Sequence, residues 1–283
     1  NMPGRLFDPR SCTLGEGPLW HPERNQLFWF DIIGKKMMSR ADNVPLEWQF
    51  EHHVSAAGWI SRDELLIASE VELFRFNVDT LARSHICPLD AANSLTRSND
   101  GRADPWGGFW IGTMGKNAEQ GAGAIYRFYR DRLERLYSGI SIANSICFCP
   151  HKACAYYTDT LSGQIMRQNL DAEGWPDRAP EVFLDLRSDR LNPDGSVVDA
   201  EGCLWNAQWG ASRVARYSPA GAFLCAYDFP AKQTSCPAFG GEDLSQLFVT
   251  SATMGMRSPE KGEGCTYQLR VPFAGQPEHQ IKL

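Results

Sequence analysis

Short apolar segments recur along this chain at a nearly constant spacing, and each follows a turn rich in Gly, Pro, Asp, Asn or Ser. Six of them begin at residues 27, 65, 109, 155, 203 and 247, so the steps are 38, 44, 46, 48 and 44 residues. After each segment comes a second strand that carries a basic or aromatic residue, as in residues 37–40 and 164–167. A repeat of this length with several strands per unit is typical of a β-propeller blade.

The repeat fills the whole chain and predicts its fold. Six similar units could also stack as an open solenoid, but no unit reads as a cap, which favours a closed ring with few exposed edges. No segment of ten or more residues has a convincing helical period. We therefore expect an all-β, six-bladed β-propeller that forms a single domain over residues 1–283, with residues 5–14 helping to close the ring.

Composition and charge narrow the class of partner. The chain is 43% hydrophobic and 22% charged, its net charge is −6, and its Lys and Arg residues are scattered without a basic run. This pattern argues against nucleic acid or an anionic membrane as partner. No apolar stretch reaches the ~20 residues of a membrane span, and no signal peptide is visible at the start. We expect a cytoplasmic monomer or weak homo-oligomer whose nine cysteines are reduced.

Superimposing the six units shows which polar residues share a position. Nine to eleven residues before the apolar segment, four units carry an oxygen-bearing side chain, namely Glu16, Asn99, Asn144 and Asp194. In a propeller the innermost strands line the channel, so these side chains should converge on its axis. Taken singly, Asn and Asp also form turns, but their shared phase favours a site. Such oxygens suit one hard divalent cation, Ca²⁺, Mg²⁺ or Mn²⁺, and tolerate Zn²⁺.

Several motifs together resemble the SMP-30/gluconolactonase/regucalcin-like family over essentially the full length. They are residues 15–20 (GEGPLW), 97–105 (RSNDGRADP), 112–114 (GTM), 144–145 (NS) and 193–195 (PDG). The resemblance implies that Glu16, Asn144 and Asp194 bind a divalent metal, that Arg97 and Asn99 contact a sugar lactone, and that Asp194 acts as general base. One departure concerns residues 115–120 (GKNAEQ), where several members of the family place a substrate-contacting Glu. Substrate identity is therefore not carried over.

The predicted function is divalent-metal-dependent hydrolysis of a sugar lactone to the open-chain acid. Lactone hydrolysis needs a polarised carbonyl, an activated water and stabilisation of an oxyanion, all of which a metal and a nearby carboxylate supply. Two alternatives stay open, namely another esterase of the aryl-ester or organophosphate type and a non-catalytic metal-binding propeller. Blade 2 has only Ser55, Ala56, Ala57 and Gly58 at this phase, so we expect a recess there for the sugar tail, facing Arg97 and Asn99.

Overall fold

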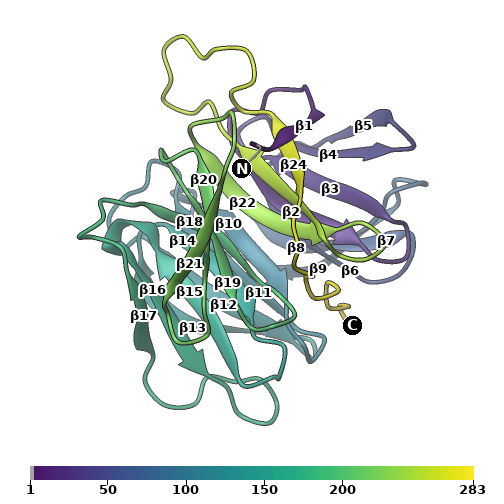
Figure 1. The fold of residues 1–283 in the computed structure, drawn as a ribbon. Coiled ribbons are helices and arrows are strands. Elements are labelled where there is room, and N and C mark those ends of the chain that lie inside the picture. Colours follow the sequence, from purple (N-terminus) through teal and green to yellow (C-terminus); the bar gives the residue numbers. More distant parts are fainter. Residues whose placement is uncertain (1–2) are drawn as a thin grey trace.

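The computed structural model describes residues 3–283, and they form six four-stranded antiparallel sheets arranged around a central channel (Figure 1). The all-β six-bladed propeller expected from the repeat is confirmed. A single turn of 3₁₀-helix, η1 (Thr160–Ser162), is the helical element within this part of the chain. Residues 3–283 include no helix long and apolar enough to cross a membrane.

Each blade is a meander that runs outward from the channel. Blade 1 contains β2 (Gly15–His21), β3 (Gln26–Asp31), β4 (Lys36–Ala41) and β5 (Val44–Gln49). Blade 2 contains β6 (Val54–Trp59), β7 (Glu64–Ser69), β8 (Glu72–Asn77) and β9 (Arg83–Pro88). Blade 3 contains β10 (Thr96–Ala103), β11 (Phe109–Gly115), β12 (Gly123–Tyr129) and β13 (Arg132–Ile140).

The second half of the chain repeats this order until the last blade. Blade 4 contains β14 (Ala143–Phe148), β15 (Cys154–Asp159), β16 (Gln164–Asn169) and β17 (Glu181–Asp185). Blade 5 contains β18 (Pro193–Val198), β19 (Leu204–Gln208), β20 (Arg213–Tyr217) and β21 (Phe223–Asp228). Blade 6 contains β22 (Thr234–Gly240), β23 (Gln246–Ser251) and β24 (Thr266–Arg270), and β1 (Arg5–Asp8) supplies its outermost strand.

The ring is closed by pairing of the two chain ends. Strand β1 is antiparallel to β24, with Arg5 opposite Gln268, and Leu14 forms an isolated bridge with Ala252. These contacts confirm that residues 5–14 help to close the propeller. Because blade 6 combines strands from both ends of the chain, the first and last blades are joined and the ring is closed.

The apolar segments of the sequence become the second strand of each blade, which is buried on both faces between neighbouring blades. Trp29, Trp110 and Trp205 on β3, β11 and β19 are fully buried. Burial on both faces explains why these strands read as continuous apolar runs instead of alternating ones. The core therefore consists of layers between blades, and the channel wall is left to the innermost strands.

The six innermost strands, β2, β6, β10, β14, β18 and β22, share one irregularity. In every one, the register with the next strand breaks near its start, for example between Asn144 and Cys147 on β14 and between Pro193 and Ser196 on β18. Such bulges redirect side chains and bend the strand. They lie at the phase of the predicted site residues, so the bulges aim these side chains into the channel mouth.

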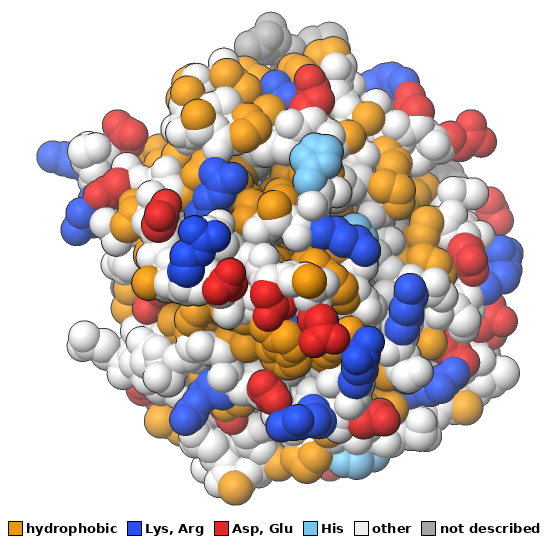
Figure 2. Space-filling model, turned by 90° about the horizontal axis from the view of Figure 1, so that it is seen from below, with side chains coloured by type: hydrophobic (Ala, Val, Ile, Leu, Met, Phe, Trp, Pro, Cys, Tyr) orange, Lys and Arg blue, Asp and Glu red, His pale blue; other side chains and the backbone are white. Residues whose placement is uncertain are grey.

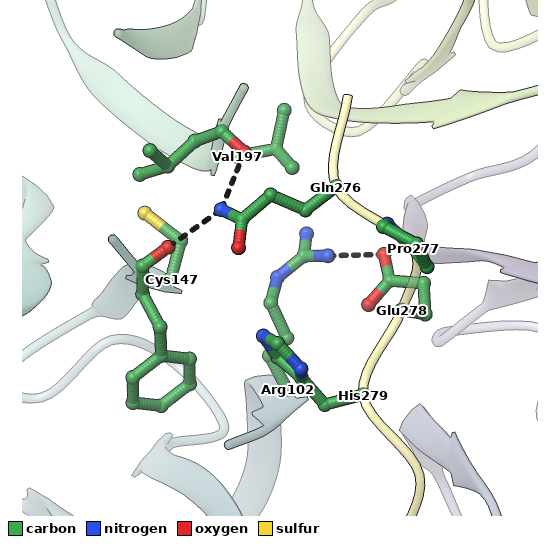
Figure 3. A pocket seen from close by; sticks show the side chains of 9 residues that line it. Arg102, Cys147, Val197, Gln276, Pro277, Glu278 and His279 are labelled. Atoms are coloured by element: carbon green, nitrogen blue, oxygen red, sulfur yellow. Dashed lines mark hydrogen bonds and ion pairs between the residues drawn. The ribbon is translucent and has the colours of Figure 1, made fainter. Parts of the chain in front are cut away.

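The segment after β24 crosses the far end of the channel, where the innermost strands end (Figure 3). The Gln276 side chain donates to the carbonyl oxygens of Phe148 and Val198 at 2.9 and 3.0 Å, and Glu278 forms an ion pair with Arg102. Further along, Ile281 is buried against blade 2. The channel is therefore open at the mouth where the strands begin and covered at the other. On the face drawn in Figure 2, charged side chains of both signs are interspersed.

Candidate functional site

A cavity of about 540 Å³ lies at the open mouth, and all five residues predicted to form the site line it. They are Glu16, Arg97, Asn99, Asn144 and Asp194. All five are buried, with at most 5% of each residue exposed. They come from the bulged starts of β2, β10, β14 and β18. The structure therefore brings together side chains that are up to 178 residues apart in the sequence, from Glu16 to Asp194.

The two carboxyl groups of this set, Glu16 and Asp194, carry charge that the protein does not neutralise. Neither has a cationic side chain within ion-pair distance in residues 3–283, and Asp194 Oδ1 is buried without a hydrogen-bond partner. Burial raises the pKa of Asp194 to about 7, and burial together with the Asp194 charge raises the pKa of Glu16 well above its usual range. Unpaired buried carboxylates are costly unless a cation joins them, so this donor set fits a divalent metal.

Asn144 is oriented by Thr160 of its own blade, which in turn contacts blade 5. Its Nδ2 donates to Thr160 Oγ1 at 2.9 Å, and that hydroxyl donates to the carbonyl oxygen of Pro193 at 2.8 Å, beside Asp194. Because the amide nitrogen is used here, Asn144 Oδ1 is the atom available to a ligand in the cavity, where Asn99 Nδ2 donates to it at 3.4 Å. The Thr160 hydroxyl thus couples two of the predicted metal ligands.

Arg97 and Asn99 form the polar wall of the cavity on blade 3. Arg97 Nη1 donates to the Ser98 carbonyl at 2.9 Å and to Asn99 Oδ1 at 3.1 Å, while Asn99 Nδ2 donates to the Ala143 carbonyl at 2.8 Å. No carboxylate of residues 3–283 lies within 4 Å of the guanidinium, and burial lowers the pKa of Arg97 to about 10. A buried guanidinium with neutral partners is ready to bind oxygens of a ligand.

Contacts between adjacent blades fix the bulges that carry these residues. Ser145 donates its hydroxyl proton to the Asp194 carbonyl, and Ser235 does the same to the Gly15 carbonyl next to Glu16. Elsewhere a glycine permits direct backbone approach. Gly17 has φ +58°, and a Cβ atom there would lie 2.4 Å from the Ser55 carbonyl oxygen. Only glycine fits that position without displacing the next blade.

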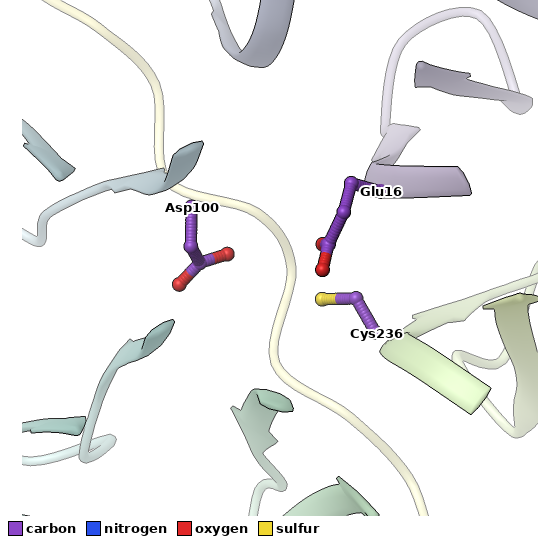
Figure 4. Close-up of side chains that lie close together, drawn as sticks. All are labelled: Glu16, Asp100 and Cys236. Atoms are coloured by element: carbon purple, nitrogen blue, oxygen red, sulfur yellow. The ribbon is translucent and has the colours of Figure 1, made fainter. Parts of the chain in front are cut away.

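Deeper in the channel, Asp100 and Cys236 approach Glu16 from blades 3 and 6 (Figure 4). One oxygen of each carboxylate and the Cys236 sulfur lie within 4.8 Å of one another. Asp100 also accepts the backbone N–H of Ile146 at 2.7 Å, and burial raises its pKa to about 6. The predicted site included neither Asp100, which directly follows Asn99, nor Cys236, which lies at the equivalent phase of blade 6 but carries sulfur instead of oxygen.

The expected recess at blade 2 is not formed. None of Ser55, Ala56, Ala57 and Gly58 lines the cavity. The Ser55 hydroxyl donates to Ser98 Oγ at 2.7 Å, and Ile281 packs where a side chain on Gly58 would stand. Small residues at this phase thus let neighbouring segments pack closely, so they do not leave space for a ligand.

The cavity wall on that side comes from the segment in which the sequence departs from the family pattern. Lys116, Asn117 and Ala118 line it, and Lys116 Nζ forms an ion pair with Glu70 Oε2 at 2.8 Å. The apolar part of the cavity lining includes Trp209 and residues 14, 114, 142 and 254. Trp209, which directly follows β19, was not among the predicted site residues.

Comparisons with known proteins agree over nearly the full length. A protein-family model described as "SMP-30/Gluconolactonase/LRE-like region" matches residues 14–253. The "Putative sugar lactone lactonase" of Rhizobium meliloti (strain 1021) is 38% identical, covering 99% of this chain and 97% of the relative. The L-arabinolactonase of Azospirillum brasilense is 36% identical, covering 89% and 84%.

Solved structures give the same result. The crystal structure of a calcium-binding protein, regucalcin, from Agrobacterium tumefaciens strain C58 superimposes with a TM-score of 0.96 at 38% identity, covering 99% of this chain and 97% of the other. The fold, the motifs that line the channel mouth and these matches lead to one assignment. The chain belongs to the SMP-30/gluconolactonase/LRE-like family.

Proposed function

We propose that this protein hydrolyses a sugar lactone to the open-chain sugar acid with the help of one bound divalent cation. The observation that carries the proposal is the convergence of Glu16, Asn144 Oδ1 and Asp194 at the mouth of the channel, with Asp194 Oδ1 buried and unpartnered. The L-arabinolactonase among the relatives supports an aldonolactone as substrate class.

The cation would be held by Glu16, Asn144 and Asp194, with waters or substrate completing its shell. When bound, it would polarise the lactone carbonyl and acidify a water molecule. An all-oxygen donor set with two carboxylates is compatible with Ca²⁺, Mg²⁺, Mn²⁺ or Zn²⁺. The choice among these ions is set by geometry and availability, so it requires direct measurement.

The protein side chains supply the remaining steps. Asp194 accepts the proton of the attacking water and passes it to the departing ring oxygen. We assign this role to Asp194 because its Oδ1 has no hydrogen-bond donor, whereas Glu16 Oε2 accepts the Gly17 N–H at 3.2 Å. Arg97 and Asn99 bind substrate hydroxyls and fix the ring relative to Asp194. A cavity of about 540 Å³ falls in the range of small-molecule sites, and Trp209 offers an apolar face for the sugar ring.

The alternatives fit the cavity less well. Arg97, Asn99 and Asn117 favour a substrate with several hydroxyl groups over an aryl ester or organophosphate, because an apolar ligand would remove water from these polar groups without giving them new partners. A non-catalytic metal-binding propeller would have no use for the unpaired guanidinium beside the carboxylates. Both are distinguished from a lactonase by direct assay.

The test is a panel of aldonolactones, from pentoses, hexoses and acidic sugars, assayed for acid release with metal-stripped protein and with each of four added cations. We expect turnover of at least one lactone that depends on an added cation. Full activity after metal removal would refute the proposed mechanism, and no turnover of any lactone with any cation would refute the proposed function.

A further inference from the structure

A repeated turn follows the innermost strands of two blades. In blades 3 and 5 an aspartate, Asp104 or Asp199, comes directly after the strand. Its Oδ1 accepts two backbone N–H groups of the following turn, at 2.8 and 2.9 Å for Asp104 and at 2.9 Å twice for Asp199. This arrangement satisfies turn donors that would otherwise be unpaired, and it requires an acceptor at that position.

The second carboxylate oxygen of each aspartate is paired with an arginine on the third strand. Arg127 Nε lies 2.8 Å from Asp104 Oδ2, and Arg216 Nε lies 3.0 Å from Asp199 Oδ2. Both arginines stand opposite a buried tryptophan of the second strand. In each of these two blades, a carboxylate is thus held between the amides of a turn and a guanidinium.

Blade 4 has a cysteine at the equivalent position. Cys149 follows β14 directly, and its Sγ accepts the backbone N–H groups of Ala153 and Cys154 at 3.3 and 3.2 Å. Arg167 on β16 stands opposite Tyr156, which is the position that Arg127 and Arg216 occupy in their blades. No carboxylate of residues 3–283 lies within 4 Å of Arg167. A position built for an anion is therefore occupied by sulfur.

This environment favours the thiolate of Cys149. Amide donors and a nearby cation stabilise the charged form of a thiol. The neighbouring Cys154 thiol, followed by the backbone N–H groups of the turn, lowers the pKa of Cys149 to about 5 against the effect of burial. The two cysteines face each other across the hairpin, since Cys149 N–H donates to the Cys154 carbonyl at 3.1 Å. Cys149 is half-buried, whereas Cys154 is buried.

We propose that Cys149 is a site of reversible oxidation by hydrogen peroxide, with Cys154 as the resolving thiol. The Cys149 sulfur attacks the peroxide O–O bond, takes one oxygen and becomes a sulfenic acid, while the other oxygen leaves as water after accepting protons. The Cys154 sulfur then attacks the sulfenic sulfur, the S–O bond breaks, and a second water leaves as the intrachain disulfide forms. Two thiols are oxidised and one peroxide is reduced.

The first test measures reactivity. At pH 6, the purified full chain is treated with iodoacetamide and the labelled cysteines are followed with time by peptide mass spectrometry. We expect Cys149 to react at least about tenfold faster than Cys87, which is also half-buried but whose pKa burial raises to about 11. Equal rates for these two cysteines would overturn the proposal.

The second test follows oxidation by hydrogen peroxide. The wild type should lose two hydrogen atoms in a cross-linked peptide that joins residues 149 and 154, and a thiol reductant should restore it. Cys154→Ser should stop at a sulfenic acid that dimedone traps at residue 149. A disulfide between Cys149 and Cys147 instead, or no oxidation at low peroxide, would overturn the assignment.

A matched control is Cys149→Asp, which installs the residue that blades 3 and 5 carry at this position. The aspartate should accept the same turn amides and pair with Arg167, so the variant should melt at or above the wild-type temperature and should resist oxidation. A marked loss of stability in Cys149→Asp would show that blade 4 is not built like its neighbours, which would remove the basis of the proposal.

Discussion

At the open mouth of the channel, Glu16 and Asp194 are buried without an ion-pair partner in residues 3–283, whereas at the covered end Arg102 is paired with Glu278. Both ends are lined by the same six strands and are similarly buried. The protein satisfies its charges with its own groups at one end and leaves them unsatisfied at the other. Uncompensated burial of this kind is expensive, so it marks the end at which a ligand completes the structure.

We infer that the residues at the open mouth serve catalysis, whereas those at the covered end stabilise the fold. Changes at the open mouth should reduce activity and leave the fold intact. Changes at the covered end should do the reverse.

Asp194→Asn should have the largest effect on activity. The substitution keeps the shape of the side chain but removes a metal ligand and the proposed base, so kcat for lactone hydrolysis should fall by about 10²–10⁴-fold. The metal-free variant should melt no lower than the metal-free wild type, because a buried repulsive charge is removed. Steady-state acid release and thermal melts in a chelator provide the two measurements, and retention of full activity would contradict the assigned role.

Glu278→Ala tests the covered end. Removing one partner leaves the Arg102 guanidinium buried and unpaired, which should cost about 3 kcal/mol of unfolding free energy. At a temperature where the variant is folded, kcat should stay within about twofold of the wild-type value. Denaturant unfolding gives the free energy, and the double variant Arg102→Met with Glu278→Leu is the control, since it should be less destabilised than Glu278→Ala alone. A drop in kcat as large as that of Asp194→Asn would break the proposed separation.

Arg97→Ala should reduce lactone turnover less than Asp194→Asn does. The guanidinium contacts no predicted metal ligand directly, so lactone turnover should fall by about 10–100-fold while the affinity for the cation stays nearly unchanged. Calorimetric titration of the cation into metal-stripped protein measures that affinity. If the cation bound more weakly by the same factor as turnover falls, Arg97 would instead be part of the metal site.

The pH dependence of the metal-free protein tests the stability of the open mouth and involves no turnover. Burial raises the pKa of Asp194 to about 7, so the folded state retains a proton that the unfolded chain, with a pKa near 3.9, has released. The stability from this group is fully present below about pH 4 and is lost as pH rises from there through about 7, by about 4 kcal/mol in total. Thermal melts between pH 5 and 8 should show a flatter profile for Asp194→Asn than for the wild type.

Much of the fold and the set of site residues could be predicted from the sequence because the blades repeat. The same phase in different units must face the same channel, so Glu16, Asn99, Asn144 and Asp194 could be aligned without knowledge of any contact. Arg97 required the family resemblance, since nothing in the repeat distinguishes it from a structural arginine.

The remaining features depend on contacts between segments distant in sequence. Small residues at 55–58 suggested empty space, but Ile281 fills it from the other end of the chain. Residues 116–118 line the cavity from the loop between β11 and β12, whose length differs from that of the corresponding loops in the other blades. Residue propensities and the repeat spacing describe each blade separately. They therefore could not show which distant segment of the chain would pack against a given blade.

The pairing of β1 with β24 makes the linear chain behave as a closed circle. Individual hairpins can form from local contacts, but the circle is complete only when residues near 5 meet residues near 268. Such a long-range step costs chain entropy before the new contacts form, so it slows folding. Once it is closed, every blade has two neighbours and no blade can detach from an end, so unfolding is expected to be a single cooperative event that starts at this seam.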